Sequence, residues 1–323
     1  MSPQVLIAEG IADVGRDILA GAGVTVVASN DAYDPQAIVG LIVRSVFRVD
    51  RATCTRFPNL RVVAKLGTGM DNIDEAVCHA AGIAVLSAPG MNSISTAEFI
   101  VTQILALWKN AYEIHDRVRQ RDYRRAVYHG RELAGIVVGL IGYGSVGKHV
   151  VERLRPFVRE VHVFDRAQAS RSAINVGNVR FVTGIEDLLP ACDVLILATT
   201  LAGNEHMVDT AFLAHVRPNV LLVNMARGGL VDEAALFEFL RTHPDARYAT
   251  DVVTHEPDYT CAPEKQSYRN PLLALSNVTY TPHIACLTPE CQERIAVTIA
   301  RRVADALMAH AVHAAERRAV LTV

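Results

Sequence analysis

Three polar residues in the second half of the chain have the types needed for acid–base work on a carbonyl group: Arg227, Glu256 and His283. A histidine can donate a proton to a carbonyl oxygen near neutral pH, and a carboxylate beside it stabilises the imidazolium form. An arginine can hold a substrate carboxylate with two parallel hydrogen bonds. Together these groups suit hydride transfer to a 2-oxo acid, because the carbonyl oxygen gains negative charge and must be protonated.

Each of the three residues also has a simpler interpretation. A histidine after a strand can be a structural hydrogen-bonding residue, Arg227 could form a loop salt bridge, and Glu256 could lie in a surface turn before Pro257. Their joint occurrence favours a shared active site over three separate structural roles, since each residue follows an apolar run of the kind that forms a buried strand. In doubly wound sheets, ligands bind outside the carboxyl ends of such strands.

A glycine-rich turn indicates the source of the hydride. Residues 137–147 read VVGLIGYGSVG, an apolar run that enters the pattern G-x-G-x-x-G. Gly142 permits the tight turn out of the strand, Gly144 leaves room for a pyrophosphate, and Gly147 lets the following helix pack closely. The free N–H groups at the start of that helix favour phosphate binding. The alternative is a plain strand–turn–helix, which the spacing makes less favoured.

An acidic residue at the end of the next apolar run completes this dinucleotide fingerprint. Asp165 follows residues 161–164, about twenty residues after the glycines, as the fingerprint requires. Its carboxylate would accept a hydrogen bond from a ribose 2′-hydroxyl and would repel a 2′-phosphate. The sequence therefore predicts NAD rather than NADP, although the adjacent Arg166 weakens this preference slightly.

Apolar runs alternate with helical patterns along nearly the whole chain, which predicts parallel sheets of an α/β fold. One helical stretch is expected over about 95–121, and a last one over about 289–313 is expected to complete the first domain. We predict two doubly wound parallel-sheet domains, one Rossmann-like and one flavodoxin-like, with the ligand site in the cleft between them. The predicted boundaries are 1–94 with 286–323 for a discontinuous substrate domain, and 95–285 for the NAD-binding domain.

Bulk composition excludes several classes of function. The net charge is −2 over 323 residues, so neither nucleic acid nor a membrane surface is an expected partner. No apolar run approaches the roughly 18 residues of a membrane-spanning helix, and the N-terminus lacks the charged region of a signal peptide. The six cysteines form no C-x-x-C pair, which favours free thiols over disulfides or a metal site. These features predict a cytoplasmic protein without a metal.

Several motifs make the chain resemble the D-isomer-specific 2-hydroxyacid dehydrogenases over nearly its whole length. The matching segments are LGTGMDNID at 66–74, the glycine fingerprint, NMARGGLVDE at 224–233, residues 251–257, and TPHIA at 281–285. The resemblance implies that His283 is the acid–base, that Glu256 pairs with it, and that Arg227 binds substrate.

The same resemblance implies the remaining contacts. Backbone amides of Gly67, Thr68 and Gly69 would hold the substrate carboxylate, in agreement with the anion-binding nests that glycine turns form. Ser145 and Val146 would lie at the pyrophosphate. The full set of implied cofactor positions is Gly142, Gly144, Ser145, Val146, Gly147, Asp165, Arg166, Thr199, Thr200, Met225, Ala226, Arg227, Asp251, His283 and Ala285.

Within the family, segments 40–45, 62–69 and 89–98 resemble 3-phosphoglycerate dehydrogenases. Arg44 could meet a phosphate or a second carboxylate, or could form a structural ion pair; Arg48 and Lys65 are lesser candidates. Two departures leave the substrate open: no regulatory domain is expected after the last helix, and the segment 258–270 is longer and more polar than usual.

The resemblance also implies a homodimer formed through the cofactor domain, with residues 112–129 as a contact. A second hypothesis is an NAD(H)-sensing, corepressor-like protein with little turnover. A third is a hydride-donor enzyme of the formate or phosphite type, which the histidine–glutamate pair disfavours because formate has no carbonyl to protonate.

Overall fold

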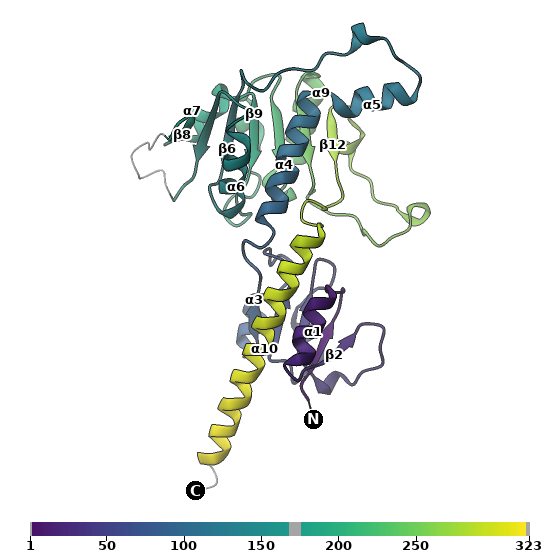
Figure 1. Ribbon diagram of the computed structural model, residues 1–323, viewed down its shortest axis with the longest axis vertical. Helices are drawn as coiled ribbons and strands as arrows, with labels where there is room; N and C mark the ends of the chain where they lie inside the picture. Colours follow the sequence, from purple (N-terminus) through teal and green to yellow (C-terminus); the bar gives the residue numbers. More distant parts are fainter. Residues whose placement is uncertain (1, 168–175, 321–323) are drawn as a thin grey trace. The chain divides into compact units, whose positions relative to one another are not determined.

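The computed structural model describes residues 2–167 and 176–320, the last ten by their backbone alone. The chain divides into two units, Met1–Asn92 with Leu287–Val323, and Ser93–Cys286 (Figure 1). The first unit is thus built from both ends of the chain. That the first unit serves the substrate and the second the cofactor stays a prediction at this stage.

The first unit contains a five-stranded parallel sheet. Its order is β2-β1-β3-β4-β5, which is the flavodoxin-like order that the sequence predicts. The strands are β1 (Gln4–Ile7), β2 (Thr25–Ala28), β3 (Ile38–Val43), β4 (Val62–Lys65) and β5 (Ala84–Leu86). The helices are α1 (Asp13–Gly21), α2 (Arg51–Arg56), α3 (Glu75–Ala80) and α10 (Pro289–Val320), with the short helix η1 (Pro35–Ala37).

The last helix returns to this sheet. α10 packs against α1 and β4, and it buries Ile295, Ile299 and Val303 almost completely. These apolar side chains recur at helical spacing, so they form the face of α10 that packs on the rest of the first unit. The helix continues to Val320, seven residues beyond the predicted end.

The second unit contains a seven-stranded parallel sheet in the order β12-β11-β10-β9-β6-β7-β8. This is the Rossmann order with one further strand, and the strand order reverses between β6 and β9. The strands are β6 (Val137–Ile141), β7 (Glu160–Phe164), β8 (Val179–Val182), β9 (Val194–Leu197), β10 (Leu221–Asn224), β11 (Arg247–Thr250) and β12 (Val278–Tyr280).

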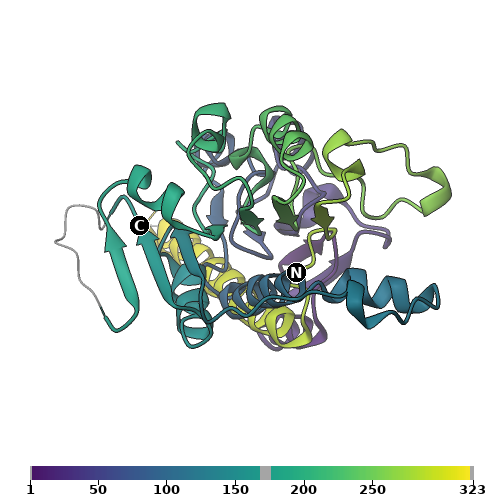
Figure 2. The same ribbon diagram turned by 90° about the horizontal axis from the view of Figure 1, so that it is seen from above.

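Helices cover both faces of this sheet (Figure 2). One hydrophobic cluster joins the strands to α4 (Ser93–Trp108) and α6 (Ser145–Leu154), and a second joins them to α7 (Ile185–Leu188), α8 (Thr210–Leu213) and α9 (Glu233–Thr242). Strands buried on both faces read as continuous apolar runs, which explains why they stand out in the sequence. The short helices are η2 (Arg125–Val127), η3 (Leu189–Ala191), η4 (Gly228–Leu230), η5 (Pro263–Lys265) and η6 (Pro271–Ala274).

The prediction of one helix over 95–121 is wrong. α4 ends at Trp108, and a separate helix, α5 (Ala111–Arg119), follows it. Asn110 between them has φ +54°, a left-handed conformation that ends a helix. Its side chain donates to His129 O (2.6 Å) and accepts from Arg247 Nη1 (2.6 Å), which fixes the break. We call residues 112–129 the arm; α5 lies in it, beyond the sheet (Figure 1).

Within the described ranges, no helix combines the length and the apolar character needed to cross a membrane.

Candidate active site

The glycine turn after β6 has the close approaches that its spacing predicts. Gly142 has φ +101°, and a Cβ on it would lie 2.5 Å from Ala198 O. A Cβ on Gly147 would lie 2.3 Å from Gly142 O, so α6 packs against the turn at a distance only glycine allows. Gly144 differs, because no atom beyond its chain neighbours lies within 4 Å of its Cβ position. The space that a pyrophosphate would need is therefore present above Gly144.

The phosphate-binding end of this turn is built from α6. The helix begins at Ser145 with Gly144 as its N-cap, so no side chain of the cap satisfies the N–H groups of the first turn. Those groups are suited to an anion. The Ser145 hydroxyl lies 2.8 Å from the hydroxyl of Ser93, which joins the first turn of α6 to that of α4.

Asp165 is held beside the glycine turn. Its carboxylate accepts hydrogen bonds from Tyr143 N (2.7 Å) and Ala167 N (3.0 Å). The neighbouring Arg166 instead donates to Gly203 O (3.4 Å). This arrangement fits a carboxylate facing the ribose of NAD, with a guanidinium that already contacts a carbonyl.

Thr199 and Thr200 follow β9, next to β6 in the sheet. The side chain of Asn204, which the sequence did not single out, donates to Thr200 O (2.8 Å) and lies 3.4 Å from the Thr199 hydroxyl. Asn204 thereby closes the turn on which both threonines lie.

Glu256 and His283 are brought into direct contact. They follow β11 and β12, which are neighbours in the sheet, and the His283 Nδ1 atom lies 2.9 Å from Glu256 Oε1 and 3.0 Å from Oε2. The two side chains are 33% and 28% exposed, so both can reach a ligand. Because the carboxylate occupies Nδ1, Nε2 is the nitrogen that remains for a substrate.

The backbone of His283 is held in an unusual conformation. Its φ is +55°, which is rare for a residue with a side chain and costs about 1–3 kcal/mol. The amide of His283 donates to Asp251 O (2.9 Å), which helps to fix the turn. Strain of this kind is typical of functional sites, where the surroundings impose one side-chain direction.

Asp251 anchors the same turn with its side chain. One carboxylate oxygen accepts from Thr281 Oγ1 (2.6 Å) and Ile284 N (2.9 Å), and the other accepts from Ala285 N (2.8 Å). Burial raises the pKa of Asp251, and these hydrogen bonds offset only part of that rise. Its implied place on the nicotinamide side of the cofactor stays a prediction, while its hold on the His283 turn is a structural finding.

Arg227 follows β10, the strand beside β11. The turn that presents it is organised by Asn224, a fully buried residue that the sequence analysis did not select as functional. Asn224 Nδ2 donates to Arg227 O (2.9 Å), and its Oδ1 accepts from Ala226 N (3.1 Å). The sequence signal that could have revealed Asn224 is its position as a polar residue at the end of the apolar run that forms β10. Met225 is buried in the core of the unit.

The three predicted catalytic residues therefore follow three adjacent strands, β10, β11 and β12, at their carboxyl ends. Of these, Glu256 and His283 touch. Gly228 also packs directly on the loop after β11, because a Cβ on it would lie 2.0 Å from the carbonyl carbon of Val253. Arg227 is thus fixed to the loop that leads to Glu256.

The predicted substrate-binding residues of the first unit follow β3 and β4. Arg44 begins a loop whose N–H groups converge on one carboxylate, that of Glu9. The Thr68 hydroxyl donates to Asn92 Oδ1 (3.2 Å), which fixes the turn formed by residues 67–69. Lys65 is buried and donates to the side chain of Asn72.

Asn72 in turn links the two loops. Its amide donates to Phe47 O (2.6 Å) and lies 3.3 Å from Arg44 O. Glu9 was not selected by sequence reasoning, because an isolated acid in a loop carries no pattern. Asn72 was quoted only within the segment 66–74, without a role of its own.

Residues 101–285 match the family model described as the NAD binding domain of D-isomer specific 2-hydroxyacid dehydrogenases. The chain is 36% identical over 256 residues to (S)-sulfolactate dehydrogenase of Chromohalobacter salexigens, covering 79% of this chain and 80% of that protein. It is 32% identical over 309 residues to D-3-phosphoglycerate dehydrogenase of Archaeoglobus fulgidus, covering 94% of this chain and 57% of the relative.

A solved D-lactate dehydrogenase from Aquifex aeolicus, complexed with NAD and lactic acid, superposes with a TM-score of 0.80. The identity is 22%, with 96% of each chain covered, so this likeness concerns the fold alone.

The family match and the relatives define an NAD-dependent oxidoreductase that acts on the CH–OH group of hydroxy acids. The chain belongs to the D-isomer specific 2-hydroxyacid dehydrogenase family. The predicted family, fold class, enzyme class and cofactor are thereby confirmed. The corepressor-like alternative finds no support among the relatives. The roles of the individual site residues stay predictions.

Proposed function

We propose that this enzyme interconverts a D-2-hydroxy acid and its 2-oxo acid, and that the substrate carries a second anionic group on the carbon next to the hydroxyl-bearing one. Sulfolactate and 3-phosphoglycerate, named for two relatives, are both 2-hydroxy acids of this form, with a sulfonate or a phosphate as the second anion. The chain spans only 57% of the latter relative, so its regulation and whole-protein activity need not be shared.

The observation that carries the proposal is the contact between His283 Nδ1 and the Glu256 carboxylate. NADH, when bound, supplies the hydride. His283 donates a proton from Nε2 to the carbonyl oxygen, while Glu256 stabilises the imidazolium before the transfer. Arg227 binds the substrate carboxylate, and the backbone amides of residues 67–69 add hydrogen-bond donors. In the reverse direction His283 takes the proton back.

Arg44 is the residue proposed to select the second anion. It follows β3 and is half-buried, and Glu9 and Asn72 bind the backbone of its loop. A guanidinium pairs well with sulfonate or phosphate because its donors form a planar fork. We therefore expect the charge of the tail, rather than its exact shape, to set the selectivity of this position.

A panel of 2-oxo acids tests the proposal, with NADH and NADPH each as reductant. 3-Sulfopyruvate and 3-phosphohydroxypyruvate should be reduced with kcat/KM at least about tenfold above that of pyruvate, since a charged hydrogen-bonded contact contributes about 1.5–3 kcal/mol. Arg44→Met should shrink that ratio. Pyruvate as the best substrate, or an unchanged ratio in the variant, would contradict the assignment.

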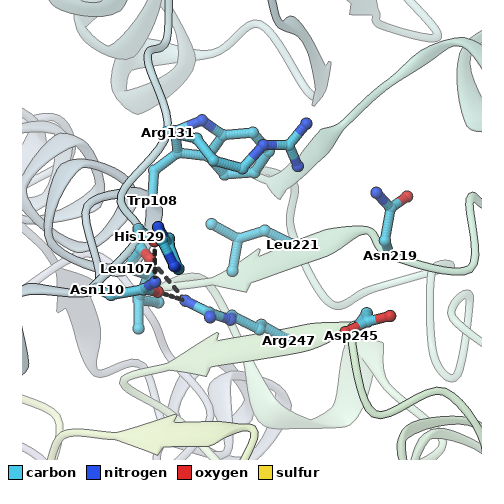
Figure 3. Close-up of a pocket in the computed structure, with 9 residues that line it drawn as sticks. All are labelled: Leu107, Trp108, Asn110, His129, Arg131, Asn219, Leu221, Asp245 and Arg247. Atoms are coloured by element: carbon cyan, nitrogen blue, oxygen red, sulfur yellow. Dashed lines mark hydrogen bonds between the residues drawn. The ribbon is translucent and has the colours of Figure 1, made fainter. Parts of the chain in front are cut away.

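We also propose a homodimer formed through the second unit. The arm exposes Tyr112, Val118, Tyr123 and Val127, the third of them to 68%. Beside the ends of the arm lies a cavity of about 400 Å³ in which Arg131 lies over the Trp108 ring (Figure 3). Exposed apolar side chains next to a hollow suit a partner subunit. Light scattering at micromolar concentration tests this, and a monomer there would refute it.

A cytoplasmic location is proposed as well. Cys54 and Cys78 are free thiols that lie in the same hydrophobic cluster. Free thiols so close together fit a reducing compartment. Recovery of the enzyme from a secreted fraction with these thiols oxidised would overturn this location.

A further inference from the structure

A second hydrogen bond joins the two loops that carry Glu256 and His283. Tyr259 lies three residues after Glu256, and Tyr280 lies three residues before His283, as the last residue of β12. Their hydroxyl oxygens are 3.0 Å apart. The Glu256–His283 contact and the Tyr259–Tyr280 contact are therefore parallel links between the same two stretches of backbone.

Tyr259 belongs to the segment 258–270, which the sequence analysis found longer and more polar than the family pattern predicts. Local hydrogen bonds order this segment: Asp258 Oδ1 accepts from Thr260 N (2.9 Å), and Asp258 O accepts from Gln266 Nε2 (3.0 Å). The segment is thus a folded element that presents the tyrosine to β12.

The stretch around Glu256 is also fastened at both ends to α9. Glu233, at the start of that helix, accepts from Thr254 N (2.7 Å) with one carboxylate oxygen and from Asn270 Nδ2 (2.7 Å) with the other. These bonds fix where the stretch begins and ends. Between these two anchored points, the hydrogen bond of the Tyr259 hydroxyl connects the stretch to Tyr280 of β12, the strand that leads to His283.

The Tyr259–Tyr280 hydrogen bond joins two groups that do not ionise near neutral pH. Tyr259 and Tyr280 are half-buried, and burial raises the pKa of each above its usual value. The nearby carboxylates of Glu256 and Asp251 raise both further, although the hydrogen bond from Tyr259 partly offsets this at Tyr280. Both phenols stay neutral near pH 7, so the hydrogen bond between them does not depend on pH in that range.

We propose that Tyr259 and Tyr280 are positioning residues for the acid–base pair. Their hydrogen bond holds the Glu256 carboxylate at the Nδ1 side of His283, and so keeps the imidazolium stabilised and Nε2 directed at the substrate. The proposal rests on the proposed function for what the pair does in catalysis, but the geometry it describes is independent of the substrate. It assigns a task to the unusual segment 258–270.

The variants Tyr259→Phe and Tyr280→Phe remove one hydroxyl each and leave the rings in place. Tyr268→Phe is the matched control, because Tyr268 lies in the same segment and its hydroxyl is 3.2 Å from the Asn270 amide of that segment. NMR titration of the histidine ring carbons, with His283 assigned from the signal lost in His283→Gln, then reports on the pair without any substrate.

We expect the titration midpoint of His283 to move down by about half a pH unit in Tyr259→Phe and in Tyr280→Phe, because a looser carboxylate stabilises the imidazolium less. The double variant should move no further than either single one, since both remove the same bond. Tyr268→Phe should leave the midpoint unchanged. Asp251 also faces His283, and its anchoring bonds are untouched in all these variants.

Kinetics supply the second readout. In Tyr259→Phe, kcat for 2-oxo acid reduction should fall severalfold while the KM for NADH stays near that of the wild type. A lower melting temperature with an unmoved His283 midpoint would overturn the positioning role. If the wild type reduces none of the 2-oxo acids, the proposed function is rejected. A shifted His283 midpoint in the variants would still support the positioning role.

Discussion

Replacing Glu9 by glutamine should destabilise the first unit and disturb the loop that begins at Arg44. Glu9 Oε2 accepts from Arg44 N (2.7 Å) and Phe47 N (3.0 Å), and Oε1 accepts from Ser45 N (3.1 Å) and Val46 N (2.7 Å). A glutamine has only one acceptor oxygen. Whichever way its amide turns, two of the four N–H groups meet an NH₂ group instead.

The expected loss of stability in Glu9→Gln follows from these four hydrogen bonds. A hydrogen bond to a charged group contributes about 1.5–3 kcal/mol, and two are lost, but partial exposure of the loop lowers the sum to about 2–4 kcal/mol. The pKa of Glu9 points the same way: burial alone would raise it, and the four backbone bonds outweigh that effect and lower it. The stabilisation is therefore present above the ordinary pKa of a glutamate and is lost as the pH falls through the lowered one.

Denaturation of wild type and Glu9→Gln between pH 3 and pH 7 provides the assay. Circular dichroism follows both units, while the single tryptophan, Trp108, lies in the second unit and serves as an internal control. Asp50→Asn is the matched variant, since Asp50 caps a helix in the same unit by accepting from Thr53 N, and asparagine caps helices equally well. Equal stability of wild type and Glu9→Gln at pH 7, or a difference that does not shrink in acid, would refute the reasoning.

Three further substitutions test the second unit. His283→Ala should lower kcat by about 10²–10⁴-fold, because general acid catalysis contributes on that scale, and should leave the affinity for NADH near that of the wild type. Steady-state rates and fluorescence titration with NADH measure the two quantities, and retained turnover would show that His283 is not the acid. Asn224→Ala should lower the free energy of unfolding by about 1–3 kcal/mol, since the half-buried Ala226 N–H loses its acceptor and the Arg227 carbonyl keeps only the N–H of Leu230. The same variant should lower kcat/KM for 2-oxo acids, and wild-type stability with normal kcat/KM would show that the turn does not depend on Asn224. Gly147→Ala should weaken NADH binding and destabilise the second unit by about 1–3 kcal/mol, because the new Cβ would lie 2.3 Å from Gly142 O. Calorimetric titration measures the affinity for NADH, and an affinity equal to that of the wild type would contradict the close packing of α6 on the glycine turn.

The sequence was sufficient for features that depend on residue type at fixed spacing. The glycines at 142, 144 and 147 predicted a turn whose packing the structure bears out at two of them, and the apolar runs predicted both parallel sheets. The pairing of Glu256 with His283 was implied by the family resemblance, and the structure brings the two side chains together because the carboxyl ends of the neighbouring strands β11 and β12 meet at one edge. The order of the strands placed them together, although 27 residues separate them in the chain.

Features set by single long-range contacts could not be predicted in this way. Asn110 ends α4 by adopting a left-handed conformation, and the Arg247 guanidinium that stabilises it lies 137 residues away. Glu9 and Glu233 are ordinary acids in the sequence, and only folding brings backbone N–H groups onto their carboxylates. Tyr259 lies in a segment without any periodic pattern, so its bond to Tyr280 has no local signal.

Single-turnover oxidation of NADH by a 2-oxo acid with an anionic tail, followed from pH 5.5 to pH 9 for wild type and Glu256→Gln, tests the central claim most directly. If the Glu256–His283 pair donates the proton, the wild-type rate falls as the pH rises through one ionisation. Glu256→Gln should then react more slowly, with its fall moved to lower pH. A rate that is the same in both proteins and independent of pH would contradict the account.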